Sequence, residues 1–274
     1  MNTRLPFGRT MRQFSAGAVL LASIGLSVWT LAVSGAVSGD IPLSPGSAPA
    51  VIAERSYLNR AFLTTHTTRA FDSTGGDLIV VCASSHATVR MTPSDSLHNT
   101  WISAAGPTNT TVGMNLRTAV WYAKGPVVGR RQTFTLELSE PQSLVISLFV
   151  VRGADRASPI DAISPIGDDG GSQTPEVNSP AVTTTASDDL LLGFAKSSAS
   201  EIWHAGPGYT SQTRASSDYL VGEIGWALAP GQYNSSFDVK SPATWQSAVL
   251  AVRPAARISE ASHVSSKPSG SRTN

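Results

Sequence analysis

Charged side chains and cysteines are scarce in this 274-residue chain. Charged residues make up 14% of it, whereas average soluble domains carry roughly 25%. The net charge of +1 and the lack of a basic stripe exclude a strongly basic nucleic-acid-binding protein. The single cysteine, Cys82, excludes a disulfide scaffold. Apolar residues reach 41%, which argues against intrinsic disorder, and the polar surface is supplied by 38 serines and 25 threonines instead.

The N-terminal segment has the pattern of an export signal. Arg4, Arg9 and Arg12 precede an uncharged apolar stretch that closes with small residues at 34–36, which is typical of a cleaved signal peptide. An uncleaved signal anchor is the alternative, because about 20 apolar residues suffice to span a bilayer. In both cases the basic end stays in the cytoplasm and the remainder lies outside. The sequence therefore predicts a secreted or cell-envelope protein that touches the membrane only through residues 1–36.

Composition divides the rest of the chain into three parts. Residues 37–56 are rich in proline, glycine and serine, which predicts a linker. Residues 254–274 are polar and lack a periodic apolar pattern, which predicts a disordered tail. The segment between them, 57–253, is long enough to bury one sizeable core. Cys82 lies in an apolar run, and we expect it to be a small buried side chain.

Short apolar or alternating segments, separated by turn residues, recur through residues 57–253. The clearest predicted strands are 78–83, 133–138, 144–151, 190–194, 219–226, 234–239 and 245–252, and the shorter candidates are 57–65, 88–92, 100–104, 117–123, 181–185 and 208–214. No long window shows the period of an α-helix. This pattern predicts an all-β fold, an antiparallel β-sandwich or jelly roll.

Two of these strands begin alike. Asp77 and Asp189 each follow polar turn residues and open an apolar run. The similarity does not extend further, so we interpret the two runs as equivalent central strands rather than as a sequence repeat. The segment 155–180 contains prolines and paired glycines without a period, and it is predicted to be a loop that crosses one sheet edge.

Several short motifs follow one another in a fixed order along residues 57–253. They are Gly76-Asp77 before an apolar strand, Ser85-His86, Asn99-Thr100-Trp101, Trp121-Tyr122-Ala123-Lys124, Val150-Val151-Arg152-Gly153-Ala154, Asp189-Leu190-Leu191-Leu192-Gly193 and Gly206-Pro207-Gly208-Tyr209-Thr210. In these motifs the chain resembles a large group of uncharacterised exported bacterial domains of jelly-roll type. The resemblance implies the fold and the location, and it implies no catalytic residues, because that group has no assigned activity.

The signatures of common enzyme sites are missing. The chain has no Gly-x-Ser-x-Gly pentapeptide, no His-Glu-x-x-His motif and no Gly-x-x-x-x-Gly-Lys run. A glycoside hydrolase needs two carboxylates close together, and the predicted strand 219–226 offers only Glu223. The sequence therefore predicts no catalytic residue, with a glycan-active enzyme as an alternative that requires carboxylates from different strands.

Two acidic loops allow two interpretations. Asp95 and Asn99 lie in one, and Asp168 and Asp169 in the other. Such side chains commonly bond to the backbone of their own turn. Their oxygens also suit a structural calcium ion, although the spacing does not match an EF-hand loop. Calcium is the only cofactor that the sequence suggests.

Aromatic residues supply the candidate ligand-binding site. Trp203, His204 and Tyr209 lie in a loop rich in glycine and proline, where an exposed aromatic ring can stack on a sugar. The alternative is that these rings fold back over a sheet end. Four tryptophans in strand patterns are expected in the core: Trp101, Trp121, Trp226 and Trp245.

Together these features predict an exported, non-catalytic domain at the cell surface or outside the cell. Its expected partner is an extracellular glycan or an envelope component, bound through loops at one end of the sandwich. The alternative is a structural or adhesive subunit of an envelope or appendage assembly, in which exposed strand edges pair between copies.

Overall fold

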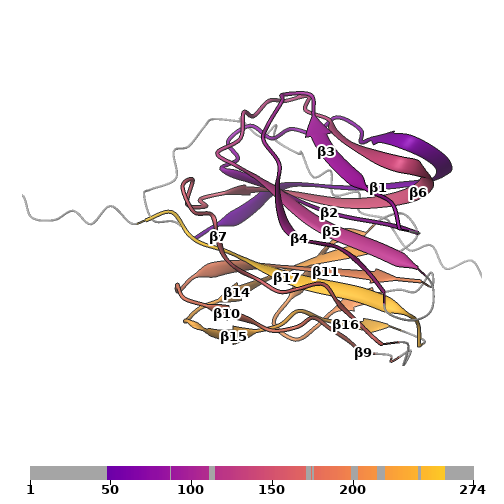
Figure 1. Cartoon of the computed structure of the whole chain (residues 1–274). Coiled ribbons are helices and arrows are strands. Elements are labelled where there is room, and N and C mark those ends of the chain that lie inside the picture. The colour runs from indigo at the N-terminus through magenta and orange to yellow at the C-terminus, as the bar shows by residue number, and fades with distance from the viewer. Residues whose placement is uncertain are drawn as a thin grey trace, which may run out of the picture. The chain divides into compact units, whose positions relative to one another are not determined.

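The computed structural model of this chain consists of β-strands and connections (Figure 1). It describes residues 48–86, 88–110, 115–170, 174, 176–198, 203–214, 220–239 and 242–256, and for residues 203, 211–214 and 239 it describes the backbone alone. Within these ranges there is no α-helix, and hence none with the length and apolarity needed to cross a membrane. The all-β prediction is confirmed for this part of the chain. The predicted export segment, 1–36, lies outside the described residues, as does the part of the predicted tail after residue 256.

Seventeen strands are described. They are β1 (Ala50–Thr67), β2 (Leu78–His86), β3 (Met91–Asp95), β4 (Ile102–Asn109), β5 (Leu116–Lys124), β6 (Phe134–Arg152), β7 (Ile160–Ile163), β8 (Gly167–Asp168), β9 (Glu176–Asn178), β10 (Val182–Thr184), β11 (Asp189–Ser197), β12 (Trp203–Ala205), β13 (Thr210–Arg214), β14 (Leu220–Ala227), β15 (Gly231–Tyr233), β16 (Ser236–Val239) and β17 (Trp245–Val252).

Two six-stranded antiparallel sheets form the centre of the fold. The first has the order β1-β6-β2-β5-β4, with β3 also paired to β6. The second has the order β13-β14-β11-β17-β7, with β8 also paired to β17. β2 lies between β6 and β5, and β11 lies between β14 and β17. The prediction that the two Asp-led runs are equivalent central strands is therefore confirmed.

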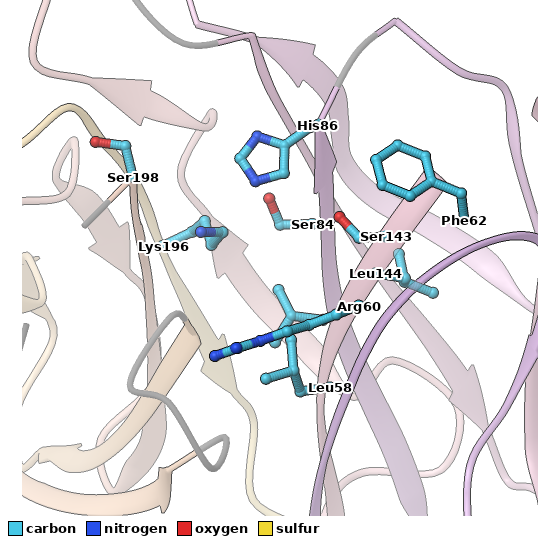
Figure 2. Close-up of a pocket in the computed structure, with 10 residues that line it drawn as sticks. Leu58, Arg60, Phe62, Ser84, His86, Ser143, Leu144, Lys196 and Ser198 are labelled. Atoms are coloured by element: carbon cyan, nitrogen blue, oxygen red, sulfur yellow. The ribbon is translucent and has the colours of Figure 1, made fainter. Parts of the chain in front are cut away.

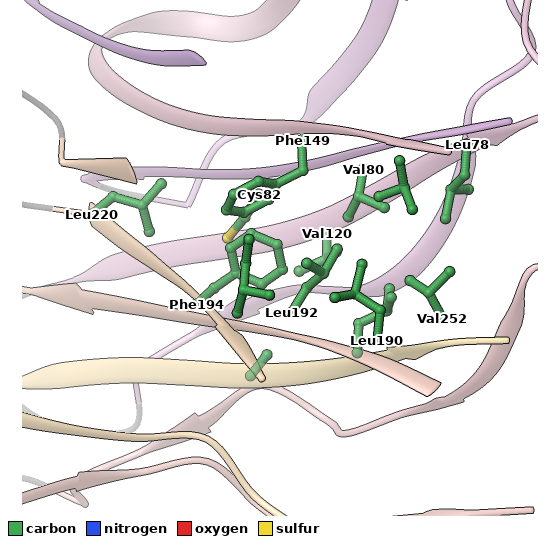
Figure 3. Close-up of a cluster of buried hydrophobic side chains, with 14 of the residues drawn as sticks. Leu78, Val80, Cys82, Val120, Phe149, Leu190, Leu192, Phe194, Leu220 and Val252 are labelled. Atoms are coloured by element: carbon green, nitrogen blue, oxygen red, sulfur yellow. The ribbon is translucent and has the colours of Figure 1, made fainter. Parts of the chain in front are cut away.

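The two sheets pack face to face through one apolar cluster, as in a β-sandwich (Figure 3). Because alternate side chains of a strand point to opposite faces, each strand contributes every second residue to this cluster. Phe149 of β6 and Phe194 of β11 meet across it with ring centroids 5.7 Å apart. Cys82 lies in the same cluster, fully buried, and burial raises the pKa of its thiol well above the ordinary range. The expectation of a small, buried cysteine is confirmed.

Further layers cover the outer faces of both sheets. The first half of β6 turns over the first sheet together with β3, and Phe134 and Met91 pack there in a second apolar cluster. On the second sheet, the small sheets β12-β16-β9 and β10-β15 bury Phe237 and Val182 against it. Both central sheets are thus covered on two sides, which explains why β2 and β11 are buried along nearly their whole length.

Three predictions need correction. β1 begins at Ala50, so residues 50–56 form a strand rather than the end of a linker, because they pair with the second half of β6. The predicted crossing loop 155–180 contains β7, β8 and β9, because β17 offers its open edge to the first two of them. Trp226 is 47% exposed rather than in the core, since it lies next to the last residue of β14, on the face of Ile224 but outside the apolar cluster between the sheets. Trp121 and Trp245 are buried as expected, and Trp101 is half-buried.

Glu223 is a buried carboxyl group that joins β14 to the outer layer. It accepts hydrogen bonds from the backbone N–H groups of Gly206 at 3.3 Å and Ser236 at 3.2 Å. Burial raises the pKa of Glu223 to about 8, against the opposing effect of these two bonds. The opposite residue on β11 is Gly193, and a Cβ there would lie 2.6 Å from Cβ of Ser235 and 2.7 Å from Cγ of Glu223. Only glycine leaves room for this close approach.

Replacing this glycine tests how tightly the outer layer packs. We expect Gly193→Ala to lower the free energy of unfolding by about 1–3 kcal/mol, because the added methyl group overpacks a closed interface. The matched control is Gly231→Ala, where the nearest atom to the new Cβ lies 3.5 Å away. Urea denaturation of both variants measures the difference. Equal stabilities of the two variants would contradict this packing.

Candidate functional site

The two central strands carry facing rows of side chains that change from apolar to polar at the same end. The rows are Leu78, Val80, Cys82, Ser84 and His86 on β2, and Leu190, Leu192, Phe194, Lys196 and Ser198 on and just after β11. The first three residues of each row lie in the apolar cluster between the sheets. The remaining residues continue along the same faces because of the two-residue period of a strand. Polar groups from both sheets therefore meet where the core ends.

A cavity of about 290 Å³ lies at this end, and we call it the strand-end pocket (Figure 2). The described residues that line it are Leu58, Arg60, Phe62, Ser84, His86, Ser143, Leu144, Val145, Lys196 and Ser198. They come from β1, β2 and β6 of the first sheet and from β11 and its end in the second sheet. The cavity is near the lower end of the size range of small-molecule sites. No aspartate or glutamate is among these lining residues.

Lys196 is the most unusual residue of the pocket, because it is a lysine with only 3% of its surface exposed. Its register partners are Leu220 on β14 and Gln246 on β17, and its Nζ donates a hydrogen bond to the backbone oxygen of Ser197. Burial disfavours the charged ammonium group and lowers the pKa of Lys196 to about 7. Lys196 is therefore neutral in about half of the molecules near pH 7.

His86 and Ser84 face Lys196 from the other sheet. Burial lowers the pKa of His86, and the positive charge of Lys196 lowers it further. The imidazole is thus neutral at pH 7 and can accept or donate a proton. Ser84 is buried, and its Oγ accepts a hydrogen bond from Oγ1 of Thr118 at 3.0 Å. This bond leaves the Ser84 hydroxyl hydrogen available to a group in the cavity.

An irregularity in β1 forms the rim of the pocket. β1 pairs with β6 at Asn59 and again at Leu63, with a shift of register between them. Oδ1 of Asn59 accepts a hydrogen bond from the backbone N–H of Ala61 at 2.9 Å, which closes a local turn. The shift places Arg60 and Phe62 beside the cavity, both exposed, with 68% of Phe62 accessible. A guanidinium group and an aromatic ring thus stand at the entrance.

The chemistry of the pocket suits an anionic ligand with a small apolar part. Arg60 is positively charged, Lys196 is half protonated near neutral pH, and His86 gains charge in acid. The serine hydroxyls supply neutral hydrogen bonds, and the leucine and valine side chains supply an apolar wall. Because no carboxylate lines the described part of the cavity, its electrostatic potential favours a carboxylate, phosphate or sulfate group.

A second polar cluster joins Asp161, Thr185, Asp189 and Arg253. Asp161 accepts hydrogen bonds from Arg253, from the backbone N–H and hydroxyl of Thr185 at 2.5 Å each, and from the N–H of Ala186 at 3.3 Å. Burial raises the pKa of Asp161, but the bonds from Thr185 and Arg253 outweigh it and hold that pKa well below its usual range. Burial and the adjacent Asp161 raise the pKa of Asp189 to about 7.

This pair of aspartates is the nearest arrangement to the two carboxylates that a glycan-active enzyme requires. The side chain of Asp161 has no exposed surface, and Asp189 is fully buried. A substrate therefore reaches neither carboxyl group in this structure. The pair fastens the start of β11 to β7 and to the chain after β17.

The structure describes the side chains of two of the three residues of the predicted aromatic site. Trp203 lies on β12 opposite Val239, and its side chain lies outside the described residues. His204 is exposed. Tyr209 is half-buried, its ring lies 2.7 Å from the position of a Cβ on Gly225, and its hydroxyl donates to the backbone oxygen of Asn234 at 2.9 Å. For Tyr209, the structure favours the interpretation of a ring folded over the sheet.

The first acidic loop is closed by its own hydrogen bonds. Oδ1 of Asp95 accepts the N–H of Leu97 at 2.7 Å, and Oδ2 accepts the indole N–H of Trp101 at 2.8 Å. Asn99 donates its amide to Oδ1 of Asp95 at 3.3 Å, and its own Oδ1 accepts the N–H of Val127 at 2.6 Å. Hydrogen-bond donors surround the carboxylate, which favours the turn interpretation over a cation site.

The second acidic loop has the same character. Oδ1 of Asp168 accepts the N–H of Gly170 at 2.9 Å, and Asp169 is buried. Across the described ranges, no group of three or more histidine, cysteine, aspartate or glutamate side chains is arranged to hold a metal ion. Structural calcium stays a prediction for both loops.

Removing divalent cations distinguishes the two interpretations of the Asp95 loop. We expect EDTA to leave the Tm unchanged, and Asp95→Asn to lower the free energy of unfolding by about 1–3 kcal/mol, because an amide nitrogen cannot accept the Trp101 indole N–H. Differential scanning calorimetry with and without EDTA measures both effects. A fall in Tm on chelation that Asp95→Asn abolishes would establish a calcium site here instead.

In comparisons with known proteins, no protein-family model, no curated protein and no solved structure matches the chain.

The burial of Lys196 predicts a specific pH dependence of stability. The unfolded chain holds a proton on this lysine up to its ordinary pKa of 10.5, whereas the folded chain releases it near pH 7. The contribution of Lys196 to the free energy of unfolding therefore rises with pH between about 7 and 10.5. Below pH 7 the buried ammonium group destabilises the fold by its full amount. We expect Lys196→Met to be more stable than the wild type at pH 6. This gap, the difference in free energy of unfolding between Lys196→Met and the wild type, should shrink by about 1.4 kcal/mol per pH unit above pH 7.

Urea denaturation of the two proteins between pH 6 and 10 measures this gap. The titration of Glu223, whose folded pKa of about 8 acts in the opposite direction, is common to both proteins and cancels. The exposed Lys124 provides the control Lys124→Met, for which the gap should stay constant. A constant gap for Lys196→Met as well would show that Lys196 is solvated.

Proposed function

We propose that this chain is an exported, non-catalytic, β-sandwich-like domain that binds an acidic sugar in the strand-end pocket. The observation that carries the proposal is that Arg60, His86 and Lys196 line one cavity, and that none of its described lining residues carries a carboxylate. The predicted export signal, with its three N-terminal arginines and apolar stretch, supports a location outside the cytoplasm. The jelly-roll type of the sandwich and a place at the cell surface belong to the same proposal.

Three features of the pocket favour a carbohydrate among anionic ligands. The exposed ring of Phe62 at the entrance offers a platform for the apolar face of a sugar ring. The hydroxyls of Ser84, Ser143 and Ser198 offer neutral hydrogen-bonding groups that match sugar hydroxyls. Arg60 offers a bidentate partner for the carboxylate of a uronic acid. The ligand-binding prediction is thus kept, but with a site different from the loop of Trp203, His204 and Tyr209.

Binding of a simple uronic acid tests the proposal. In isothermal titration calorimetry at pH 6, we expect methyl β-D-glucuronoside to bind at least about tenfold more tightly than the neutral methyl β-D-glucoside. The preference should weaken from pH 6 to pH 8, because Lys196 loses its proton near pH 7. A methyl glycoside has no free carbonyl group, so only non-covalent binding is measured.

Two arginine variants locate the binding. Arg60→Gln should abolish most of the preference for the acid. Arg156→Gln is the matched control, because Arg156 is also exposed and lies outside the pocket, beside Asp77, which precedes the opposite end of β2. Equal affinity for the acidic and neutral glycosides, or equal effects of the two variants, would contradict the proposed site.

A further inference from the structure

The primary amine of Lys196 lies in a buried position, which is rare for lysine. It stands at the inner wall of a cavity that is open to small molecules. The residue is 3% exposed, yet it lines the strand-end pocket. Its charge acts on the imidazole of His86, which lines the same pocket from the opposite sheet. A lysine in such surroundings is a nucleophile at neutral pH, because desolvation favours the form with a free electron pair.

The neighbours of Lys196 define what the amine can do. An amine in its neutral form reacts with aldehydes and ketones, and His86 is positioned in the same cavity to move the protons that this reaction requires. Arg60 at the rim supplies a partner for a carboxylate carried by the same small molecule. Amine, imidazole and guanidinium groups together match a compound that bears both a carbonyl and a carboxylate.

We propose that Lys196 captures a carbonyl-bearing organic acid in the strand-end pocket as a reversible covalent imine. The ligand class is a 2-oxo acid or an acidic sugar in its open-chain carbonyl form. The recognition of the carboxylate rests on the proposed function above, whereas the reactivity of the amine does not.

The reaction balances without any further reagent. The electron pair of Nζ forms a bond to the carbonyl carbon, and one of the two Nζ protons passes through His86 to the carbonyl oxygen, which gives a carbinolamine. The second Nζ proton passes through His86 to the hydroxyl group, which leaves as water. One C=N bond replaces one C=O bond, one water is released, and nothing is oxidised or reduced. Hydrolysis reverses the sequence, so the ligand is bound and released rather than converted.

The four lysines of the chain make the proposal directly testable. They are Lys124, Lys196, Lys240 and Lys267. Lys124 is exposed and donates to the backbone oxygen of Ala157 at 3.2 Å, so it serves as the solvent-exposed amine for comparison. Lys196 is buried and half neutral near pH 7. A reaction that selects the neutral amine therefore separates the two.

The experiment is reductive trapping with glyoxylate. The full chain is incubated at pH 7 with glyoxylate and sodium cyanoborohydride, which reduces an imine to a stable carboxymethyl amine, and the modified lysines are located by peptide mass spectrometry. We expect Lys196 to be modified at least about tenfold faster than Lys124. Lys196→Met should lose this fast modification, and Lys124→Met should keep it. Circular dichroism checks that Lys196→Met retains the β-sheet spectrum, as expected when an apolar side chain of similar length replaces a buried amine.

The proton-transfer role of His86 has its own readout. His86→Gln should slow the trapping of glyoxylate at Lys196 several-fold, and it should slow the trapping of acetaldehyde, which carries no carboxylate, by a similar factor. Unchanged trapping rates in His86→Gln would overturn the role of His86 in the reaction.

Acetaldehyde in place of glyoxylate separates this inference from the proposed function. Faster trapping of glyoxylate than of acetaldehyde at Lys196, with the difference lost in Arg60→Gln, supports both. Equal trapping of the two probes at Lys196 supports covalent capture and overturns carboxylate recognition. Trapping at Lys196 no faster than at Lys124 overturns covalent capture, and it does so whether or not methyl β-D-glucuronoside binds.

Discussion

The two-residue period of the central strands is the constraint on which this structure depends. Side chains at alternate positions of β2 and β11 must share one face, and these two faces pack against each other through Val80, Phe194 and their neighbours. Because of the same geometry, the side chains of the next residues in each row, among them His86 and Lys196, point into the space between the sheets. A pocket with polar walls is therefore a direct continuation of the apolar core. Neither strand can shift its register without moving the core and the pocket together.

Much of the fold could be predicted from the sequence, because apolar runs bounded by turn residues report directly on buried strands. The central position of β2 and β11 followed from their matching Asp-led openings. The full extent of β1 was not predicted, since residues 50–56 directly follow the prolines at 42, 45 and 49, and only their pairing with β6 identifies them as part of the strand. The strands within 155–180 are short, and pairing rather than their own composition makes them strands: β7 and β8 pair with β17, and β9 pairs with β16.

The strand-end pocket was missed because its residues are far apart in the sequence and gain meaning only from strand pairing. One signal was present: in both Asp-led runs the alternating apolar residues give way to polar ones, Ser84 and His86 in the first and Lys196 in the second. The sequence patterns favoured residues in loops as ligand-binding and metal-binding candidates instead. Asp95 and Tyr209 fasten turns and layers through hydrogen bonds to N–H donors and to a backbone oxygen. In this fold, Asp95 and Tyr209 hold loops in place through hydrogen bonds, and the buried ends of β2 and β11 carry the imidazole and the amine of the pocket.

If the ends of the two facing rows form one anion-binding pocket, a crystal of the chain grown with methyl β-D-glucuronoside should hold the sugar in the cavity between β2 and β11. Its carboxylate should lie within hydrogen-bonding distance of Arg60 or Lys196, and its ring should lie against Phe62. A sugar bound elsewhere while the cavity holds only water, or a pocket closed by a different pairing of β1, would show that the rows do not form such a site.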